Sequence, residues 1–265
     1  MVRLSPLSAL RVVTSPPLTL AGWLRHDVVS EVLAGLEGVR SVLEVGAGEG
    51  AFGVRLAAAY DYTGLEPDER AFAIARRRLD GLGRGTILNG SVELLDPDAR
   101  FDLVCAFEVL EHQEDPVAAL AQWRNRAAPG GRLLLSVPAG ERLRASDLRV
   151  GHYRRYSTER IAVELDEAAL EPLLQRHFGF PLGHGLELVR NVVAARQGPA
   201  PTRAEGTGAS GRWLQPAESL GWATRAASAP FRSLQRRWPA PALGTSILVL
   251  ARPKEAAAAA GPADG

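Results

Sequence analysis

An acid and three alternating glycines form the first group of residues that could do chemistry: Glu44, Gly46, Gly48 and Gly50. Glycine lets the backbone come close to a ligand and takes φ values that other residues avoid. A carboxylate two residues before the first glycine would attract a cationic group of a ligand and would repel a pyrophosphate. The alternative interpretation is a tight turn that binds no ligand.

Five arginines and one histidine form a second group, within residues 142–155. Guanidinium groups bind carboxylate and phosphate in a fork, so this stretch could recognise an anionic or sugar-like molecule. An unperturbed imidazole titrates near pH 6.5, which makes His152 a candidate to remove a proton from that molecule. The alternative is that the arginines pair with the local acids Glu141 and Asp147 and only fix the loop.

The elements around the glycines must be a strand and a helix. Residues 42–45 are a short apolar run, and Phe52, Val54, Leu56 and Ala57 recur as one stripe of a helix. A strand, a glycine turn and a helix in this order are the start of a βαβ nucleotide site. The N-terminus of the helix would offer free N–H groups to the ligand.

A second short strand, residues 61–66, ends in an acid. Glu66 lies 20 residues after Gly46, which would place it at the carboxyl edge of the neighbouring strand. A carboxylate there can accept hydrogen bonds from both ribose hydroxyls of an adenosine. Glu66 therefore indicates an adenosine-containing ligand, although a solvated acid at a strand end is the alternative.

Two motifs resemble class I S-adenosylmethionine-dependent methyltransferases. Residues 44–50 (EVGAGEG) match the family pattern (E/D)-x-G-x-G-x-G, whereas the dinucleotide fingerprint G-x-G-x-x-G is met only two residues beyond the strand end, by residues 48–53. Residues 101–138 (FDLVCAFEVLEHQEDPVAALAQWRNRAAPGGRLLLSVP) resemble the second half of the same methyltransferases, which a nicotinamide-dependent dehydrogenase would not show. Residues 151–157 (GHYRRYS) resemble a G-H-x-R-R-Y-S signature found in a subset of them.

The resemblance implies S-adenosylmethionine as the cofactor and assigns a set of contacts. The cofactor-binding residues would be Glu44, Gly46, Ala47, Gly48, Gly50, Glu66, Pro67, Ser91, Val92, Phe107 and Glu108. Ser91 departs from the family, which often has an acid nearby, so an adenine contact there would come from its hydroxyl or its backbone. The acceptor would meet His112, Tyr153, Arg154, Arg155 and Tyr156, with His152 as the catalytic residue. For the pair Glu111-His112 we favour a structural or cofactor-positioning role over proton transfer.

Composition limits the classes of function. The chain has 265 residues and a formal charge of +1, so no bulk attraction to nucleic acid is expected. One cysteine, Cys105, fits a reducing compartment and lies in an apolar run typical of a core strand. No run of 18 apolar residues predicts a membrane span, and the N-terminus lacks the pattern of a secretory signal. We therefore expect a cytoplasmic protein with a small-molecule acceptor and no metal ion; the oligomeric state stays open.

The family resemblance predicts the fold class: an α/β, doubly wound, Rossmann-like sheet of seven mostly parallel strands, with helices on both faces and a reversed last strand. We expect an N-terminal lead-in and capping helix over residues 1–35 and a methyltransferase domain over 36–252. Within that domain, residues 183–237 would form a helical lid before the last strand, with a flexible loop at 198–211 and one helix interrupted at Pro230. Residues 253–265 would be a disordered tail.

The resemblance implies methyl transfer from S-adenosylmethionine, and the arginine-rich stretch predicts a small-molecule acceptor that is anionic or sugar-like. A sulfonium methyl is already activated by its positive charge, so the protein mainly has to align donor and acceptor and exclude water. Two alternatives remain: an NAD-dependent oxidoreductase, and a protein that binds the cofactor without turnover. The acceptor itself, and whether oxygen, nitrogen or carbon is methylated, stay open.

Overall fold

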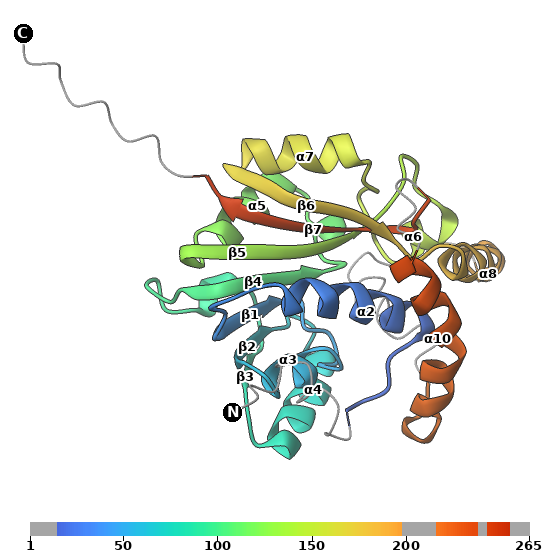
Figure 1. Cartoon of the computed structure of the whole chain (residues 1–265), viewed down its shortest axis with the longest axis horizontal. Coiled ribbons are helices and arrows are strands. Elements are labelled where there is room, and N and C mark those ends of the chain that lie inside the picture. Colours follow the sequence, from blue (N-terminus) through green and yellow to red (C-terminus); the bar gives the residue numbers. More distant parts are fainter. Residues whose placement is uncertain (1–14, 198–215, 238–242, 255–265) are drawn as a thin grey trace, which may run out of the picture.

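Seven strands form one sheet in the order β3-β2-β1-β4-β5-β7-β6 (Figure 1). The structure is a computed structural model, and it describes residues 15–197, 216–237 and 243–254. The strands are β1 (Ser41–Val45), β2 (Asp61–Leu65), β3 (Thr86–Leu88), β4 (Phe101–Phe107), β5 (Ala127–Pro138), β6 (Leu170–Phe178) and β7 (Ser246–Pro253). β7 runs antiparallel to both of its neighbours, and the pairs among β1 to β5 are parallel.

The apolar runs of the sequence are the central strands. β1 lies between β2 and β4, with Val42 opposite both Tyr62 and Leu103. Strands covered on both faces must be apolar along their whole length, and the residues of β4 from Leu103 to Phe107 are all buried. Cys105, one of them, is a free, buried thiol, as predicted. The predicted fold class, including the reversed last strand, is confirmed.

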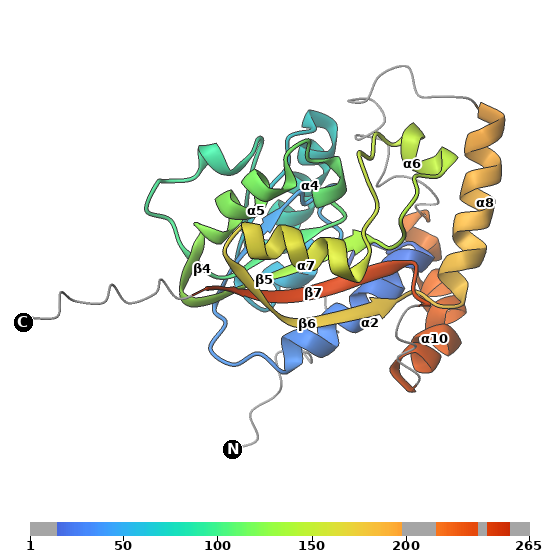
Figure 2. The same ribbon diagram turned by 90° about the horizontal axis from the view of Figure 1, so that it is seen from above.

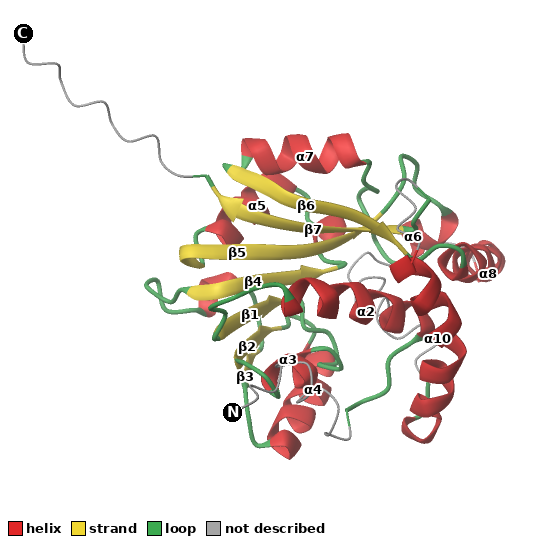
Figure 3. Ribbon diagram, in the orientation of Figure 1, coloured by secondary structure: helices red, strands yellow, loops and turns green. Residues whose placement is uncertain are grey.

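Helices cover both faces of the sheet (Figures 2 and 3). They are α2 (Leu20–Ala34), α3 (Gly53–Ala57), α4 (Glu69–Leu82), α5 (Pro116–Arg124), α6 (Ala145–Arg149), α7 (Thr158–Glu167), α8 (Leu182–Gln197) and α10 (Gly221–Arg237), with short 3₁₀ turns η1 (Val92–Leu94), η2 (Leu110–His112) and η3 (Glu218–Leu220). The core over one face contains residues of α2, α3 and α4, and the core over the other contains residues of α5 and α7. This is the arrangement of a doubly wound sheet, in which the two directions of winding place their helices on opposite faces.

Capping side chains fix where three of the helices begin. The carboxylates of Asp68 and Asp115 accept hydrogen bonds from the backbone N–H groups three residues later, at 2.8 and 2.9 Å, and the Ser157 hydroxyl does the same at 3.2 Å. Such side chains satisfy N–H groups that have no partner within the helix. α5 begins at Pro116, directly after its cap.

Two helices, α8 and α10, precede β7 and lie with α6 at one end of the sheet (Figures 1 and 2). The expected interruption at Pro230 is wrong, because α10 continues through this residue. Contacts with α2 hold the helix on the far side of the proline: Gln235 donates to the Leu24 carbonyl oxygen at 3.0 Å, and Arg236 pairs with Asp27 at 2.7 Å. The predicted loop at 198–211 lies outside the described residues.

The C-terminal end of the described chain differs from the predicted tail. Pro253 belongs to β7, and the Lys254 backbone N–H donates to the Ala169 carbonyl oxygen at 2.9 Å. Residues 255–265 of that tail, and residues 1–14 of the predicted lead-in, lie outside the described residues. Among the residues that the structure describes, no helix combines the length and the apolar character needed to cross a membrane.

Candidate active site

The three glycines form the turn between β1 and α3, and they serve two purposes. All three have positive φ, 72° at Gly46, 56° at Gly48 and 73° at Gly50, a region that favours glycine. A β-carbon on Gly46 would lie 2.5 Å from a methyl of Val109, and one on Gly50 would lie 2.8 Å from the β-carbon of Ala75. A β-carbon on Gly48 would meet no atom of the described residues within 4 Å. Gly46 and Gly50 therefore allow close packing, whereas Gly48 faces open space.

That open space is a cavity of about 570 Å³ at the carboxyl ends of β1, β2 and β4. Open α/β sheets bind their ligands at this edge, and the volume suits a small molecule or cofactor. The structure brings ten of the eleven predicted cofactor-binding residues to its lining: Glu44, Gly46, Ala47, Gly48, Glu66, Pro67, Ser91, Val92, Phe107 and Glu108. Gly50 does not line it, because this glycine packs against α4.

Glu66 is bound to the glycine turn by its carboxylate. One oxygen accepts the Gly48 backbone N–H at 2.7 Å, and the other accepts the Asp68 backbone N–H at 2.8 Å. Burial raises the pKa of Glu66, and these two hydrogen bonds oppose the shift. Each carboxylate oxygen has a second lone pair, so Glu66 can hold the turn and still accept hydrogen bonds from a ligand.

Glu44 is a buried acid, and no cationic side chain of the described residues lies at hydrogen-bond distance from it. Its side chain is only 2% exposed and accepts a hydrogen bond of 2.6 Å from the Tyr62 hydroxyl. Burial raises the pKa of Glu44 to about 8, against the opposing effects of Tyr62 and the more distant Arg25. A cationic ligand group in the cavity would stabilise the ionised form of this carboxyl.

Glu108 stands at the end of β4 in a strained conformation. Its φ is 57°, and non-glycine residues in this region concentrate at functional sites. Its carboxylate accepts a hydrogen bond of 2.9 Å from the Ser136 hydroxyl and lies 3.8 Å from the guanidinium of Arg25. Arg25, on α2, is a lining residue that the sequence analysis did not identify.

A cluster of two histidines and two acids forms the cavity wall next to Glu108. His152 Nε2 lies 3.8 Å from Glu111 Oε1, and its Nδ1 lies 3.2 Å from Asp147 Oδ1. The His112 and His152 rings meet edge to face, with centroids 4.7 Å apart. His152, Glu111 and Asp147 are at most 5% exposed. Burial and the neighbouring His152 lower the pKa of His112 to about 3, so its imidazole is neutral.

Arg155 lines the cavity, but local acids bind its guanidinium. Two of its nitrogens donate to Asp147 at 2.6 and 2.9 Å, and the third donates to Glu187 of α8 at 2.7 Å. Although burial opposes it, contacts with His152 and Arg155 hold the pKa of Asp147 below its usual range. The guanidinium is thus paired with local acids, as in the alternative interpretation, whereas its role in binding the acceptor stays a prediction.

Three other residues predicted to bind the acceptor do not line the cavity. Tyr156 is fully buried, and its side chain belongs to the core beside α7. Arg154 donates to the Glu114 carbonyl oxygen at 2.8 Å and stacks over the Tyr153 ring at 5.6 Å. Of the expected acceptor-binding set, the structure brings only His112 and Arg155 to the cavity, together with the expected catalytic His152.

Acids outnumber bases around the cavity. The described lining residues include nine acids (Glu44, Glu49, Glu66, Asp68, Glu93, Glu108, Glu111, Asp147 and Glu187) and three arginines (Arg25, Arg155 and Arg190). Two of these arginines already face carboxylates of the same wall, Arg25 toward Glu108 and Arg155 toward Asp147. Burial raises the pKa of Glu44 to about 8 and that of Glu111 well above its usual range, so these two carboxyls are neutral at pH 7. The other seven acids still outnumber the three arginines, and the wall therefore favours a ligand that carries positive charge.

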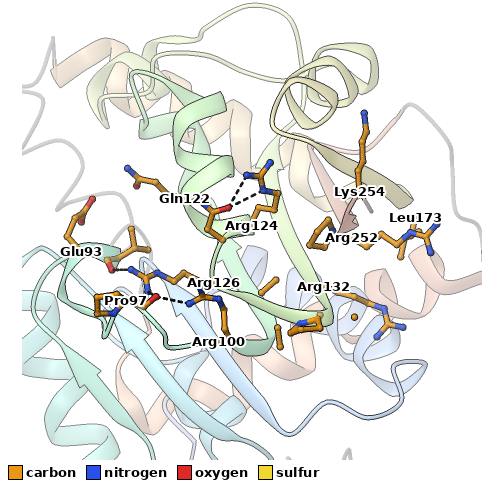
Figure 4. A pocket seen from close by; sticks show the side chains of 18 residues that line it. Glu93, Pro97, Arg100, Gln122, Arg124, Arg126, Arg132, Leu173, Arg252 and Lys254 are labelled. Atoms are coloured by element: carbon orange, nitrogen blue, oxygen red, sulfur yellow. Dashed lines mark hydrogen bonds between the residues drawn. The ribbon is translucent and has the colours of Figure 1, made fainter. Parts of the chain in front are cut away.

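A second hollow, of about 1110 Å³, lies at the opposite edge of the sheet (Figure 4). Its lining includes six basic residues: Arg100, Arg124, Arg126, Arg132, Arg252 and Lys254. Two of these basic side chains have partners within the protein. Arg126, labelled in Figure 4, donates to the carbonyl oxygens of Asp96 and Val92, and Arg252 pairs with Glu171. Neither the glycine turn nor the histidine cluster reaches this hollow, so the cavity beside Gly48 is the candidate active site.

The sequence did not predict three residues that line the site, for different reasons. The sequence identifies Asp147 as an acid near the arginines, but a spacing of eight residues does not predict that it pairs with Arg155. Glu187 comes from α8 and Arg25 from α2, far away in the sequence. No local signal distinguishes either from an ordinary surface charge on a helix.

Comparisons with known proteins agree with this site. A model of the methyltransferase domain family matches residues 22–182. The "Probable S-adenosylmethionine-dependent methyltransferase" of Mycolicibacterium smegmatis is 39% identical over 117 residues, 43% of this chain and 44% of that protein. A ubiquinone biosynthesis O-methyltransferase of Alkalilimnicola ehrlichii is 36% identical over 117 residues, 43% and 47% of the two chains. A tRNA U34 carboxymethyltransferase of Haemophilus influenzae is 33% identical over 116 residues, 42% and 36%. The matches span less than half of each relative's length.

Solved structures share the fold at low sequence identity. An S-adenosylmethionine-dependent methyltransferase from Clostridium acetobutylicum superposes with a TM-score of 0.55 at 9% identity, over 88% of this chain and 91% of that one. The cyclase SpnF superposes with a TM-score of 0.53 at 21% identity, over 86% and 81%. These likenesses concern the fold alone. The family match, in contrast, covers more than half of the sequence, including the glycine turn and the histidine cluster, and it shows that this chain belongs to the methyltransferase domain family.

Proposed function

We propose that this chain transfers a methyl group from S-adenosylmethionine to a small-molecule acceptor. The observation that carries the proposal is the open side of Gly48, bound through its N–H to Glu66, at the edge of an acid-rich cavity. S-adenosylmethionine carries an adenosine and a sulfonium cation. A strand-end carboxylate suits its ribose, and the surplus of acids suits its positive charge.

The lining residues suggest how the cofactor lies. Glu66 would accept hydrogen bonds from the ribose hydroxyls, and the backbone around Ser91 and Val92 would border the adenine. Glu44 and Glu108 would face the cationic end, where the buried Glu44 carboxyl gains most from a positive neighbour. The sulfonium methyl would then point toward the wall that holds His112 and His152.

The protein's part in the reaction is alignment. When bound, S-adenosylmethionine would supply the methyl group: its bond to sulfur would break as the bond to the acceptor forms, and the electron pair would stay on sulfur as a neutral thioether. Holding the two reactants in line supplies most of what such a transfer needs. If the acceptor must lose a proton, His152 is the group that we propose to activate it, because it lines the cavity between two carboxyl groups, with Nε2 3.8 Å from Glu111 and Nδ1 3.2 Å from Asp147.

The acceptor side of the cavity is bordered by α8, through Leu186, Glu187 and Arg190. We propose that α8 and α10 form a lid over the acceptor, in keeping with the domain division expected from the sequence. Since Arg155 is bound by Asp147 and Glu187, the geometry favours a hydroxyl-bearing acceptor over an anionic one. The resemblance of residues 151–157 to a family signature remains part of the proposal, now as a loop-fixing element.

The relatives differ in what their names say they modify, so the acceptor must be found by experiment. The test is incubation of the purified chain with S-adenosylmethionine labelled in the methyl group and extract of the source cell, with RNA and small-molecule fractions kept apart. We expect the label in a small molecule. Label in the RNA fraction would refute the acceptor class, and cofactor binding without any labelled product would favour a binding protein without turnover.

A further inference from the structure

The hollow at the edge of the sheet opposite the candidate active site carries a large excess of positive charge (Figure 4). Its described lining includes six basic residues and a single acid, the exposed Glu93. Two of the basic side chains have carboxylate partners outside the lining. Arg252 pairs with Glu171 at 2.8 Å. Lys254 pairs with Asp166. The charge of the other four must be balanced in another way.

These four basic residues form no ion pair with any described residue: Arg100, Arg124, Arg126 and Arg132. Three of them donate hydrogen bonds to carbonyl or side-chain amide oxygens. Those acceptors are neutral, so the bonds fix the guanidinium groups without cancelling their charge. All except Arg100 are half-buried, and burial makes an unbalanced charge more costly.

Two of the guanidinium groups are direct neighbours on one side of the hollow. Nη1 of Arg100 and Nη1 of Arg126 donate to the same oxygen, the Pro97 carbonyl, at 2.7 and 3.2 Å. Like charges at such short range repel each other. An anion that contacts both groups would turn this repulsion into attraction.

A second pair of arginines lies on the opposite side of the hollow. Leu133 of β5 is the register partner of Ala251 of β7, so Arg132 and Arg252 occupy adjacent positions on neighbouring strands. Like charges opposite each other in a sheet are destabilising. Glu171 balances one of these two arginines, and the charge of Arg132 remains.

Both sides keep N–H donors that bind no described residue. The hydrogen bonds of Arg100 come from Nη1 alone, which leaves Nε and Nη2. Arg132 makes no hydrogen bond within the described part of the chain. A guanidinium carries five N–H donors in a rigid fork that matches the oxygens of a phosphate group. Each side of the hollow can therefore receive one phosphate group in this way.

We propose that this hollow binds a small anion that carries several phosphate groups. Arg100 and Arg126 lie on one side, and Arg132, Arg252 and Lys254 lie on the other (Figure 4), so a ligand that reaches both sides needs more than one anionic group. A volume of about 1110 Å³ has room for such a molecule. The described lining has no aromatic side chain on which the bases of a single-stranded nucleic acid would stack. Binding here is independent of the proposed methyl transfer.

The test is calorimetric titration of the full chain, without an affinity tag, with inorganic tripolyphosphate at low ionic strength. The wild type should bind one equivalent. Arg132→Gln removes a charged donor on one side and Arg100→Gln removes one on the other, so each should weaken binding by about 10–100-fold. Because Arg132 has no partner in the described chain, its substitution should not lower the melting temperature. Inorganic phosphate, which reaches only one side, should bind at least about tenfold more weakly than tripolyphosphate.

Arg77→Gln is the matched control, because Arg77 is an exposed arginine of α4 that does not line the hollow. This variant should bind tripolyphosphate as the wild type does. Equal weakening by Arg77→Gln and Arg132→Gln, or no binding by the wild type at millimolar tripolyphosphate, would overturn the site. Equal affinities for phosphate and tripolyphosphate, or tighter binding of a single-stranded RNA through the same arginines, would overturn the class of ligand. Saturating S-adenosylhomocysteine should leave the tripolyphosphate affinity unchanged, whereas competition would place the anion in the cavity beside Gly48 and refute the proposal.

Discussion

Gly48→Ala should separate cofactor binding from folding. The substitution places a methyl group in the cavity at a position where no atom of the described part of the chain lies within 4 Å. The backbone N–H that Glu66 accepts is retained, so the turn keeps its hydrogen bond. What changes is the room available to a ligand and the strain of an L-residue at a φ of 56°.

The two effects have different sizes. An L-residue in the left-handed region costs roughly 1–2 kcal/mol, and in a chain of this length 1 kcal/mol lowers the melting temperature by roughly 2–4 °C. If the bound cofactor lies against Gly48, a β-carbon at this position would displace the cofactor. We expect at least a tenfold loss of S-adenosylmethionine affinity, which corresponds to about 1.4 kcal/mol.

Gly83→Ala provides the matched control. Gly83 ends α4 with a φ of 69°, is exposed, and has no atom within 4 Å of a β-carbon. It should therefore lose a similar amount of stability and bind the cofactor normally. Calorimetry and thermal denaturation of both variants give the comparison. Equal cofactor affinities in Gly48→Ala and Gly83→Ala would refute the idea that the ligand lies against the turn.

Three further predictions concern buried charged groups. Glu66→Ala should weaken the binding of S-adenosylmethionine and of S-adenosylhomocysteine equally, by roughly 1–3 kcal/mol in calorimetry, since both contain the same ribose. Unchanged affinities would mean that Glu66 only holds the turn. Burial raises the pKa of Glu44 from 4.5 to about 8 in the folded state. As the pH rises, the unfolded chain therefore loses this proton before the folded chain does, and the free energy of unfolding should fall between about pH 4.5 and pH 8. Urea denaturation at several pH values should show this slope, and Glu44→Gln should flatten it. In Arg155→Lys the lysine cannot reproduce the paired N–H donors of the guanidinium, so the melting temperature should drop while the cofactor affinity stays the same. An unchanged melting temperature would contradict the proposed role of Arg155 in fixing the loop.

The parts of the fold that the sequence predicts are those with local causes. Alternating glycines after an apolar run require a turn between a strand and a helix, and the structure has it between β1 and α3. Asp115 and Ser157 mark helix starts because a capping side chain needs only its own next three residues. The reversed last strand, in contrast, came from family resemblance, because no local pattern encodes strand direction.

The parts that it did not predict depend on contacts between distant segments. An arginine looks the same in a sequence whether it is free or paired, and Arg155 is paired because α8 brings Glu187 to it. Pro230 removes one backbone donor from α10, yet the helix persists because side chains of its last turns bind α2. Tertiary contacts outweighed the local preference in both cases.

The antiparallel pairing of β6 and β7 has a consequence for how such a protein can diversify. Phe178, the last residue of β6, is the register partner of Ser246, the first residue of β7. Residues 179–245, which contain α8 and α10, therefore leave and rejoin the sheet at neighbouring points. Since the two ends of the segment are register partners, we expect insertions and deletions between them to leave the strand register and the glycine turn unchanged. Exchange of this one segment between relatives would thus replace the cavity wall that α8 forms, the proposed acceptor side, and retain the glycine turn.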